Sequence, residues 1–287
     1  MIEMESTIAV LLTCHNRKDK TLLCLDSFFK AEKPSGFSFD IFLVDDGSND
    51  GTSCQVLKKY PSIKVIQGDG NLFWNKGMRL AWETAIEKQE YNFYLWLNDD
   101  TVLYNNAINE LIKCSEETYI KESKETIITG AFKTAEKENR FSYGGRTDLG
   151  DVIPNGQLQQ CTYINGNTVI IPNEVYKQIG VLSKDYTHTM GDFDYGLRAI
   201  EAGFKCYTTR KYIGICELNE EVSGWCNPKI SIFKRLQLLH APNGLNIKEY
   251  KKFRQRFWLK TYRIYIAKAY IKCIFPSLYN ILKIKKK

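Results

Sequence analysis

The chain has 287 residues, 44% of them hydrophobic and 13% aromatic, with a formal net charge of +7. This length and apolar content allow a sizeable core, and the absence of internal repeats, low-complexity tracts or a Pro/Gly/Ser linker favours one main domain. The nine cysteines are dispersed, with no Cys-x-x-Cys motif and no Cys/His cluster. Together with the lack of a recognisable secretory leader, they indicate reduced thiols and a cytoplasmic protein.

The first hundred residues alternate between strand-like and helix-like patterns. Apolar runs within 7–17, 40–50 and 95–103 are each followed by polar residues, and 21–31 has apolar positions at helical spacing. Alternation of this kind predicts an α/β fold with a Rossmann-like, mostly parallel central sheet, right-handed crossovers and flanking helices. A nicotinamide dehydrogenase is disfavoured, because the turn at 13–17 lacks the glycines that a dinucleotide pyrophosphate requires.

Two acidic pairs follow predicted strands one βα unit apart. Asp45 and Asp46 end the run at 40–50, and Asp99 and Asp100 end the apolar run that starts at Leu95. Ligands of open parallel sheets bind at the carboxyl ends of the strands, and carboxylates there suit a divalent cation with substrate phosphates. A solvated turn that caps the next helix is the alternative for Asp99 and Asp100.

These motifs resemble family 2 glycosyltransferases, which have the GT-A nucleotide-diphospho-sugar transferase fold. The family's Val-Asp-Asp-Gly-Ser signature resembles residues 44–52, and its Asp-x-Asp-like metal motif resembles 98–100. Further matching segments, in chain order, are 8–17, 75–77 within 68–78, 164–176 and 190–203. The segment 71–78, which contains Trp74, is most similar to bacterial rhamnosyltransferase-like members.

The resemblance implies a role for each matching residue. Asp45 or Asp46 would accept the ring N–H of uracil or thymine, Asp99 would face the ribose, and Asp100 would bind Mg²⁺ or Mn²⁺ between the phosphates. Other expected neighbours of the nucleotide-sugar donor are Thr13, Asn16, Arg17, Asn71, Trp74 and Lys76. Arg17 and Lys76 are also compatible with plain surface charges.

The resemblance also indicates a catalytic base. The family motif Glu-Asp-x-Asp aligns with 191–194, where Gly191 replaces the Glu, so Asp192 aligns with the base and Asp194 follows two residues later. An inverting transfer needs such a carboxylate to deprotonate the acceptor hydroxyl. Either aspartate is equally suited to capping the helix that follows. We expect Arg198 to pair with Asp194, and Asn165 and Gly166 to belong to the acceptor loop.

One departure concerns the metal. Many family members have a metal-binding His after the base helix, but residues 211–225 contain none, and Cys216 and Glu217 occupy that neighbourhood. We therefore expect the ion to be held mainly by Asp100, phosphates and water.

The C-terminal residues have a different charge from the rest. Residues 250–287 contain twelve Lys or Arg and no Asp or Glu, whereas 1–249 hold 28 basic and 33 acidic side chains. Nine aromatic residues lie in the same range. Aromatic side chains interleaved with this charge predict a helical basic extension that binds an anionic membrane surface. Nucleic acid is the rival partner, disfavoured because the body is acidic, and a helical hairpin packed on the body is the third interpretation.

We therefore predict a metal-dependent inverting glycosyltransferase of hexosyl or deoxyhexosyl groups. A UDP- or dTDP-sugar would be the donor, and a surface polysaccharide such as capsule or O-antigen, lipid-linked at the inner face of the cell membrane, the acceptor. The catalytic domain would span 1–249, with a nucleotide-binding half at about 1–104 and an acceptor half at about 105–249, and 250–287 would be the extension. The alternatives are a sugar-nucleotide pyrophosphorylase and an inactive nucleotide-sugar-binding scaffold.

Overall fold

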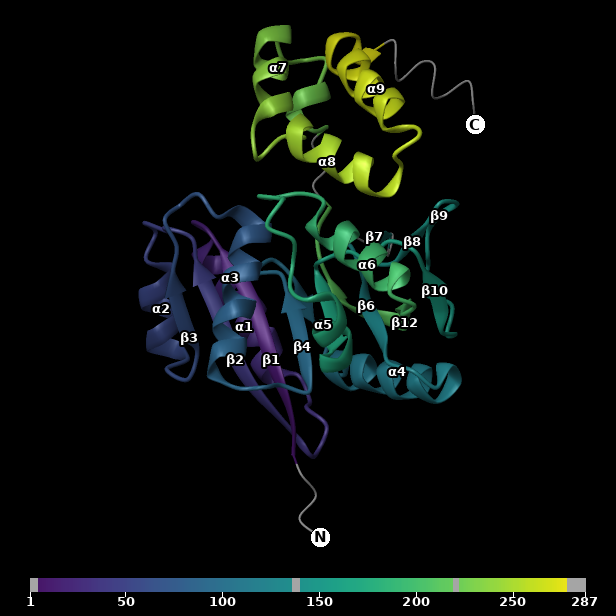
Figure 1. The fold of residues 1–287 in the computed structure, drawn as a ribbon. Helices are drawn as coiled ribbons and strands as arrows, with labels where there is room; N and C mark the ends of the chain where they lie inside the picture. The colour runs from purple at the N-terminus through teal and green to yellow at the C-terminus, as the bar shows by residue number, and fades with distance from the viewer. Residues whose placement is uncertain (1–4, 136–139, 219–221, 278–287) are drawn as a thin grey trace. The chain divides into compact units, whose positions relative to one another are not determined.

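The structure, a computed structural model, describes residues 5–135, 140–218 and 222–277. Internal contacts divide the chain into two compact units, whose elements are labelled in Figure 1. The sheet unit comprises Met1–Ser183 and Asp192–Leu218. The helical unit comprises Lys184–Gly191 and Asn219–Lys287.

The sheet unit is built on one large sheet with the strand order β10-β12-β6-β11-β4-β1-β2-β3. These strands are β1 (Ser6–Cys14), β2 (Phe37–Asp45), β3 (Lys64–Gln67), β4 (Phe93–Leu97), β6 (Thr126–Lys133), β10 (Gln159–Cys161), β11 (Thr168–Pro172) and β12 (Lys205–Ile215). The half formed by β4, β1, β2 and β3 is entirely parallel, and β11 runs antiparallel to both β4 and β6.

Short strands complete the sheet unit at its edges. β5 (Val102–Leu103) pairs with β12, β7 (Phe141–Tyr143) pairs with β6, and β8 (Arg146–Thr147) with β9 (Gly150–Asp151) forms a separate ribbon. The predicted α/β fold with a large, mostly parallel central sheet is confirmed.

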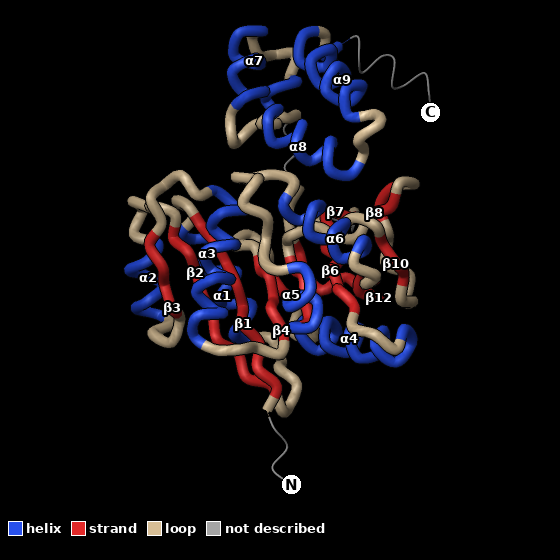
Figure 2. Tube along the Cα trace, in the orientation of Figure 1, coloured by secondary structure: helices blue, strands red, loops and turns tan. Residues whose placement is uncertain are grey.

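Helices cover both faces of this sheet, as the helix and strand colours of Figure 2 show. One face packs on α1 (Lys18–Lys30), α2 (Thr52–Lys59) and α4 (Ala107–Glu122), and the other on α3 (Phe73–Lys88), α5 (Asn173–Ile179) and α6 (Gly191–Glu201). The strand β1 explains this arrangement. Ile8, Val10 and Leu12 belong to the first core, and Ala9 and Leu11 to the second. An uninterrupted apolar strand therefore buries side chains on both faces, as the strands of parallel sheets do.

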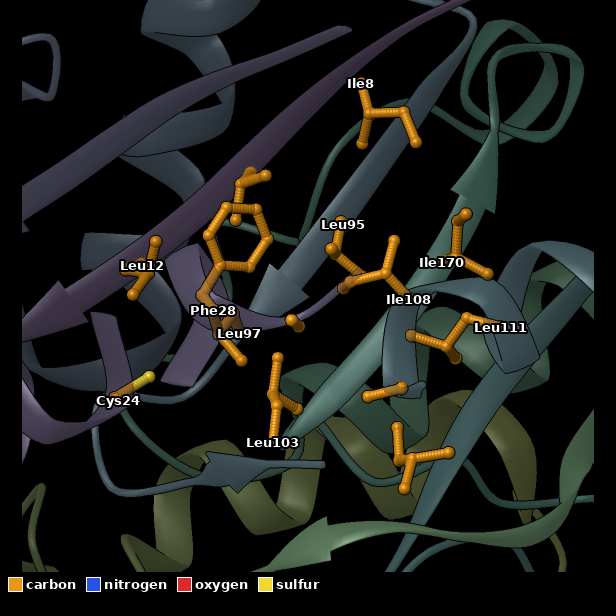
Figure 3. Packing of buried hydrophobic residues seen from close by; sticks show 14 of the residues in the cluster. Ile8, Leu12, Cys24, Phe28, Leu95, Leu97, Leu103, Ile108, Leu111 and Ile170 are labelled. Carbon is orange, nitrogen blue, oxygen red and sulfur yellow. The ribbon is translucent and has the colours of Figure 1, made fainter. Parts of the chain in front are cut away.

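Part of the first core is drawn in Figure 3, where Leu12, Cys24 and Phe28 lie in the same cluster as Leu95 and Leu97. The helix α1 begins where Asp50 accepts the N–H of Lys18 at 2.9 Å. Asp50 also accepts the N–H of Thr52 at 3.0 Å, at the start of α2. One carboxylate thus satisfies backbone donors at the starts of two helices, which fixes the loops at the carboxyl ends of β1 and β2.

The helical unit contains η1 (Gly224–Cys226), α7 (Ile232–His240), α8 (Ile247–Phe257) and α9 (Tyr262–Ile274). Its core consists of Leu239, Ile247, Ala269 and Cys273. Arg235 is buried and donates from Nε to the carbonyl oxygen of Cys273 at 2.7 Å, which ties α7 to the end of α9.

This unit begins earlier than the change in charge at residue 250, which lies inside α8. The change in charge shows only where basic residues become frequent. The boundary of the unit is set by its core, which includes Leu239 of α7. The last ten residues of the predicted extension, 278–287, lie outside the described residues. Within the described parts of the chain, every helix is too short or too polar to span a bilayer.

Candidate active site at the carboxyl ends of the strands

The loops after β1 and β2 are joined side by side. The N–H of Asn16 donates to Oγ of Ser48 at 2.8 Å, and Oδ1 of Asn16 accepts the N–H of Asn49 at 2.9 Å. Asn16 has a φ of 50°, a left-handed conformation that Asn tolerates better than most residues. Asn16, a predicted nucleotide neighbour, therefore also fixes the shape of these two loops.

The first acidic pair is buried and bonded to the protein. Asp45 accepts the N–H of Ser48 at 3.0 Å and the hydroxyl of Ser53. Asp46 accepts three backbone N–H groups, those of Gly70, Leu72 and Phe73, at 2.8, 2.9 and 2.9 Å. Both carboxylates thus hold the loops around the site, and a contact with a base ring N–H has to use their remaining lone pairs. That contact stays a prediction.

One arginine bonds to both carboxylates of the second acidic pair. Nη1 of Arg17 donates to Oδ1 of Asp99 at 2.9 Å and to Oδ2 of Asp100 at 3.2 Å. Burial raises the pKa of Asp99 to about 6, and the charge of Arg17 opposes that rise. Arg17, but neither Asp99 nor Asp100, also lines a hollow of about 350 Å³. The other residues that line this hollow are Asn16, Lys18, Asp19, Lys20 and Asp50. Arg17 therefore contacts the predicted metal motif and also borders open space that suits an anionic ligand.

Asp100 fits a cation site that relies on few protein ligands. Its carboxylate is partly exposed, and Sγ of Cys216 lies 3.9 Å from Oδ1. Cys216 in turn accepts a hydrogen bond from Nδ2 of Asn167 at 3.0 Å. Among the residues that the structure describes, no three His, Cys, Asp or Glu side chains are grouped to hold a metal ion. Mg²⁺ accepts a site with one protein carboxylate when phosphates and water supply its other ligands.

Trp74 connects the predicted metal motif to the predicted acceptor loop. Its Nε1–H donates to Oδ1 of Asn98 at 2.7 Å, and Nδ2 of Asn98 lies 3.3 Å from Oδ1 of Asn167. The indole lies against the backbone of Gly166, where an added Cβ would come within 2.7 Å of Cη2 of Trp74. Gly166 is therefore required here for close approach, not for an unusual backbone angle.

Asp192 lies at the same glycine. The N–H of Gly166 donates to Oδ2 of Asp192 at 3.1 Å, and the N–H of Phe193 donates to Oδ1 at 2.8 Å. Burial raises the pKa of Asp192 to about 6, and these two N–H groups oppose the rise. A carboxylate with such a pKa is ionised at neutral pH and is a stronger base than an ordinary aspartate.

Asp194 has a structural partner. It is fully buried and accepts a hydrogen bond from Nε of Arg198 at 2.7 Å, as the spacing of the two residues predicted. Arg198 also donates to the carbonyl oxygens of Ile179 at 2.6 Å and Val181 at 3.0 Å. The pair therefore joins α6 to the last residue of α5 and to the segment that follows it.

The other predicted residues are distributed around these groups. Thr13 is buried between β1 and α3. It packs so closely on Gly77 of α3 that a Cβ added to this glycine would lie 2.9 Å from the Cβ of Thr13. Asn71 and Lys76 are exposed. Asn165 uses its Oδ1 to accept the N–H two residues later at 3.1 Å, which shapes the loop before β11.

Two residues outside the predicted set contact predicted site residues or their neighbours. His15 lies in the loop after β1, with Nδ1 at 2.6 Å from the carbonyl oxygen of Asp46. Asn167 lies between Asn98 and Cys216, as described above. His15 and Asn167 are each adjacent in sequence to a predicted site residue. Their contacts join residues more than thirty positions apart, so the sequence alone does not predict these contacts.

Comparison with known proteins identifies the family. The description "Glycosyl transferase family 2" matches residues 9–178, so the chain belongs to that family. The matched range contains both acidic pairs and Gly166, and it ends before Asp192.

Curated relatives include larger enzymes. A hyaluronan synthase of Streptococcus pyogenes is 30% identical over 112 residues, which are 37% of this chain and 26% of that protein. A dolichyl-phosphate beta-glucosyltransferase of Trichomonas vaginalis is 24% identical over 76% of this chain and 55% of that protein. The chain thus spans about a quarter of the length of the hyaluronan synthases and about half of the second relative.

Solved structures share the fold. A mannosyltransferase of Pyrobaculum calidifontis in complex with GDP-Man and Mn²⁺ aligns with a TM-score of 0.54 and 11% identity, over 91% of this chain and 73% of that one. S. aureus TarS in complex with UDP-GlcNAc aligns with a TM-score of 0.52 and 15% identity, over 90% of this chain and 75% of that one. The fold of the protein is GT-A, and the protein is a family 2 glycosyltransferase.

Proposed function

We propose that the protein is a metal-dependent, inverting glycosyltransferase that uses a UDP- or dTDP-sugar and a surface-polysaccharide acceptor. The main support for this proposal is that Trp74 and Asp192 both contact Gly166: the indole packs on its backbone, and the carboxylate accepts its N–H. This arrangement brings a carboxylate of raised pKa to the loop that also holds the metal motif through Asn98. A donor-binding edge and a base are thereby combined in one site.

The donor side would be organised by Asp100 and Arg17. When bound there, Mg²⁺ or Mn²⁺ would offset the charge that develops on the leaving nucleoside diphosphate. Arg17 already bonds to Asp99 and Asp100 and would remain available to a phosphate at the neighbouring hollow. Binding of Mn²⁺ and a nucleotide-sugar by similarly folded proteins supports this role.

The acceptor side would depend on Asp192. Its ionised carboxylate would take the proton of the acceptor hydroxyl as that oxygen attacks the anomeric carbon, with no covalent enzyme intermediate. The two N–H groups that bond to its oxygens fix the orientation of the carboxylate and leave further lone pairs for that proton.

The helical unit offers a surface suited to an anionic membrane. Ile264, Ile271 and Phe275 are 54%, 48% and 57% exposed and follow one stripe along α9 and its end. Lys268 lies in this stripe and Lys272 beside it. An apolar stripe with cationic residues can insert shallowly between anionic head groups, and we assign no nucleic-acid partner to it.

This surface places the enzyme, in our proposal, at the cytoplasmic face of the cell membrane with a lipid-linked glycan as acceptor. The names of the curated relatives, a hyaluronan synthase and a dolichyl-phosphate glucosyltransferase, support a glycan or lipid-linked acceptor.

A binding and hydrolysis panel tests the proposal. Calorimetry with UDP-, dTDP- and GDP-sugars in Mn²⁺ should show tighter binding of the uracil or thymine nucleotides. Asp45 or Asp46 would accept the single ring N–H of these bases, whereas guanine presents a ring N–H beside an amino group and needs a different arrangement of acceptors. EDTA or Asp100→Ala should weaken that binding, whereas Glu116→Ala, an exposed change on α4, should not. Preference for GDP-sugars would contradict the donor assignment, and binding unchanged by EDTA would contradict the metal.

A further inference from the structure

The loop that leads to Asp192 is held by helix α8. Glu249, Lys252 and Phe253 occupy positions i, i+3 and i+4 of α8, which lie on one face of a helix. Each of them contacts a residue of the segment 184–190. The contacts of this segment assign it to the helical unit, although it is separated from α8 by more than fifty residues of sequence.

The strongest of these contacts joins Glu249 to Thr187. Oε2 of Glu249 accepts the N–H of Thr187 at 2.9 Å, and Oε1 accepts its hydroxyl at 2.7 Å. Thr187 is buried, so both bonds lie largely out of water, and a carboxylate acceptor makes them stronger than neutral hydrogen bonds. They fix the backbone and the side chain of Thr187 together.

Two more contacts hold the residues before Thr187. Tyr186 and Phe253 are buried and meet edge to face, with ring centroids 6.2 Å apart and an interplanar angle of 78°. Nζ of Lys252 donates to Oδ1 of Asp185 at 2.8 Å, but this pair is exposed and contributes little. The segment 184–190 is therefore held on α8 mainly by the buried aromatic pair and by the two hydrogen bonds to Glu249.

The backbone after Thr187 is strained. Met190 has a φ of 74°, a left-handed conformation that costs a non-glycine residue on the order of 1–2 kcal/mol. Such a conformation persists only where the surrounding structure imposes it. Met190 is followed by Gly191, the first residue of α6, and then by Asp192. Attachment at Thr187 therefore constrains the chain five residues before the proposed base.

We propose that Glu249 is a positioning residue for glycosyl transfer: through Thr187, it holds the segment 184–190 so that Asp192 is presented to the acceptor. This inference rests on the proposed function of Asp192. It gives α8 a part in positioning the base for the acceptor hydroxyl and none in donor binding.

Glu249→Ala tests the inference, with hydrogen exchange and kinetics measured on the full chain. Amide protection across 184–190 should fall about tenfold or more, because the acceptor of the Thr187 N–H is lost. At saturating donor, kcat for transfer should fall about 10- to 100-fold, the usual effect of misplacing a reacting group, while the donor Kd stays unchanged. Glu249→Gln should restore most of the activity, since its amide can accept the N–H and donate to the hydroxyl of Thr187.

The neighbouring exposed change Lys248→Ala serves as the matched control and should alter neither quantity. If Glu249→Ala does not fold, Thr187→Val replaces it, because it removes only the hydroxyl contact and should lower kcat with the donor Kd retained. Wild-type kcat despite lost protection would overturn the positioning role, and unchanged protection would overturn the attachment. Failure of the wild-type protein to bind any nucleotide-sugar would overturn the proposed function itself, and that result is obtained before any variant is compared.

Discussion

The N–H of Gly166 donates a hydrogen bond of 3.1 Å to Oδ2 of Asp192. The same glycine supports the indole of Trp74, which bonds to Asn98 of the metal motif. A residue without a side chain therefore lies between the proposed donor and acceptor halves of the site, and a change of a single methyl group there should disturb both.

Gly166→Ala should lower the transfer rate about 100-fold, since the new Cβ has to displace Trp74 or move the loop that bonds to Asp192. Trp74→Phe shortens the ring at the point of overlap, so Gly166→Ala should cost less in that background than alone. A double-mutant cycle on kcat measures this coupling. Additive effects of the two changes would contradict the contact.

Asp194→Asn should affect stability more than chemistry. Asp194 is fully buried with Arg198, and its loss of charge leaves the guanidinium without its anionic partner. We expect urea unfolding to show a loss of about 1–3 kcal/mol, with transfer per folded molecule little changed. The control is Glu83→Gln, which removes the charge from a partly exposed i,i+4 pair with Arg79 and should cost less than about 0.5 kcal/mol. A larger loss of transfer than Asp192→Asn would move the base to Asp194.

Replacing Ile264, Ile271 and Phe275 with Ser should weaken binding to anionic vesicles and leave nucleotide-sugar binding intact. Point changes are preferable to truncation, because removing α9 would also remove the carbonyl that Arg235 contacts. Leu149→Ser is the control, since Leu149 is 100% exposed in the sheet unit. Co-sedimentation with anionic and neutral vesicles at low and high salt measures the effect. Equal binding of the triple variant and the wild type would contradict the membrane surface.

The acid limb of the pH profile should report Asp192. Burial raises its pKa to about 6, and a base acts only when it is ionised, so activity is present above pH 6 and lost as the pH falls through that value. We expect kcat at saturating donor to fall about tenfold per pH unit below 6. A rate that is flat down to pH 5 would contradict this assignment.

The sequence was sufficient for the class of fold and for the strands that end at the two acidic pairs. It missed the short strand β3 (Lys64–Gln67), so these pairs lie two βα units apart and not one, as the sequence had predicted. Apolar runs ending in Asp45 and Asp99 sufficed because the strand period and the crossover rule leave few topologies. The pairing of Asp194 with Arg198 also followed from helical spacing.

Other features depend on contacts distant in sequence. Asp46 accepts hydrogen bonds from the backbone of residues 70–73, and Glu249 accepts one from Thr187. These bonds join residues more than twenty positions apart, and no local sequence pattern predicts them. The helical unit likewise extends beyond the basic residues, because its core includes apolar side chains of α7.

The most direct test of the account compares the wild type with Asp192→Asn in one transfer assay, with donor Kd measured alongside. We predict that Asp192→Asn binds the nucleotide-sugar as the wild type does and loses transfer by about 10²- to 10⁴-fold, the usual contribution of a positioned general base. Transfer at the wild-type rate by Asp192→Asn would show that Asp192 is not the general base.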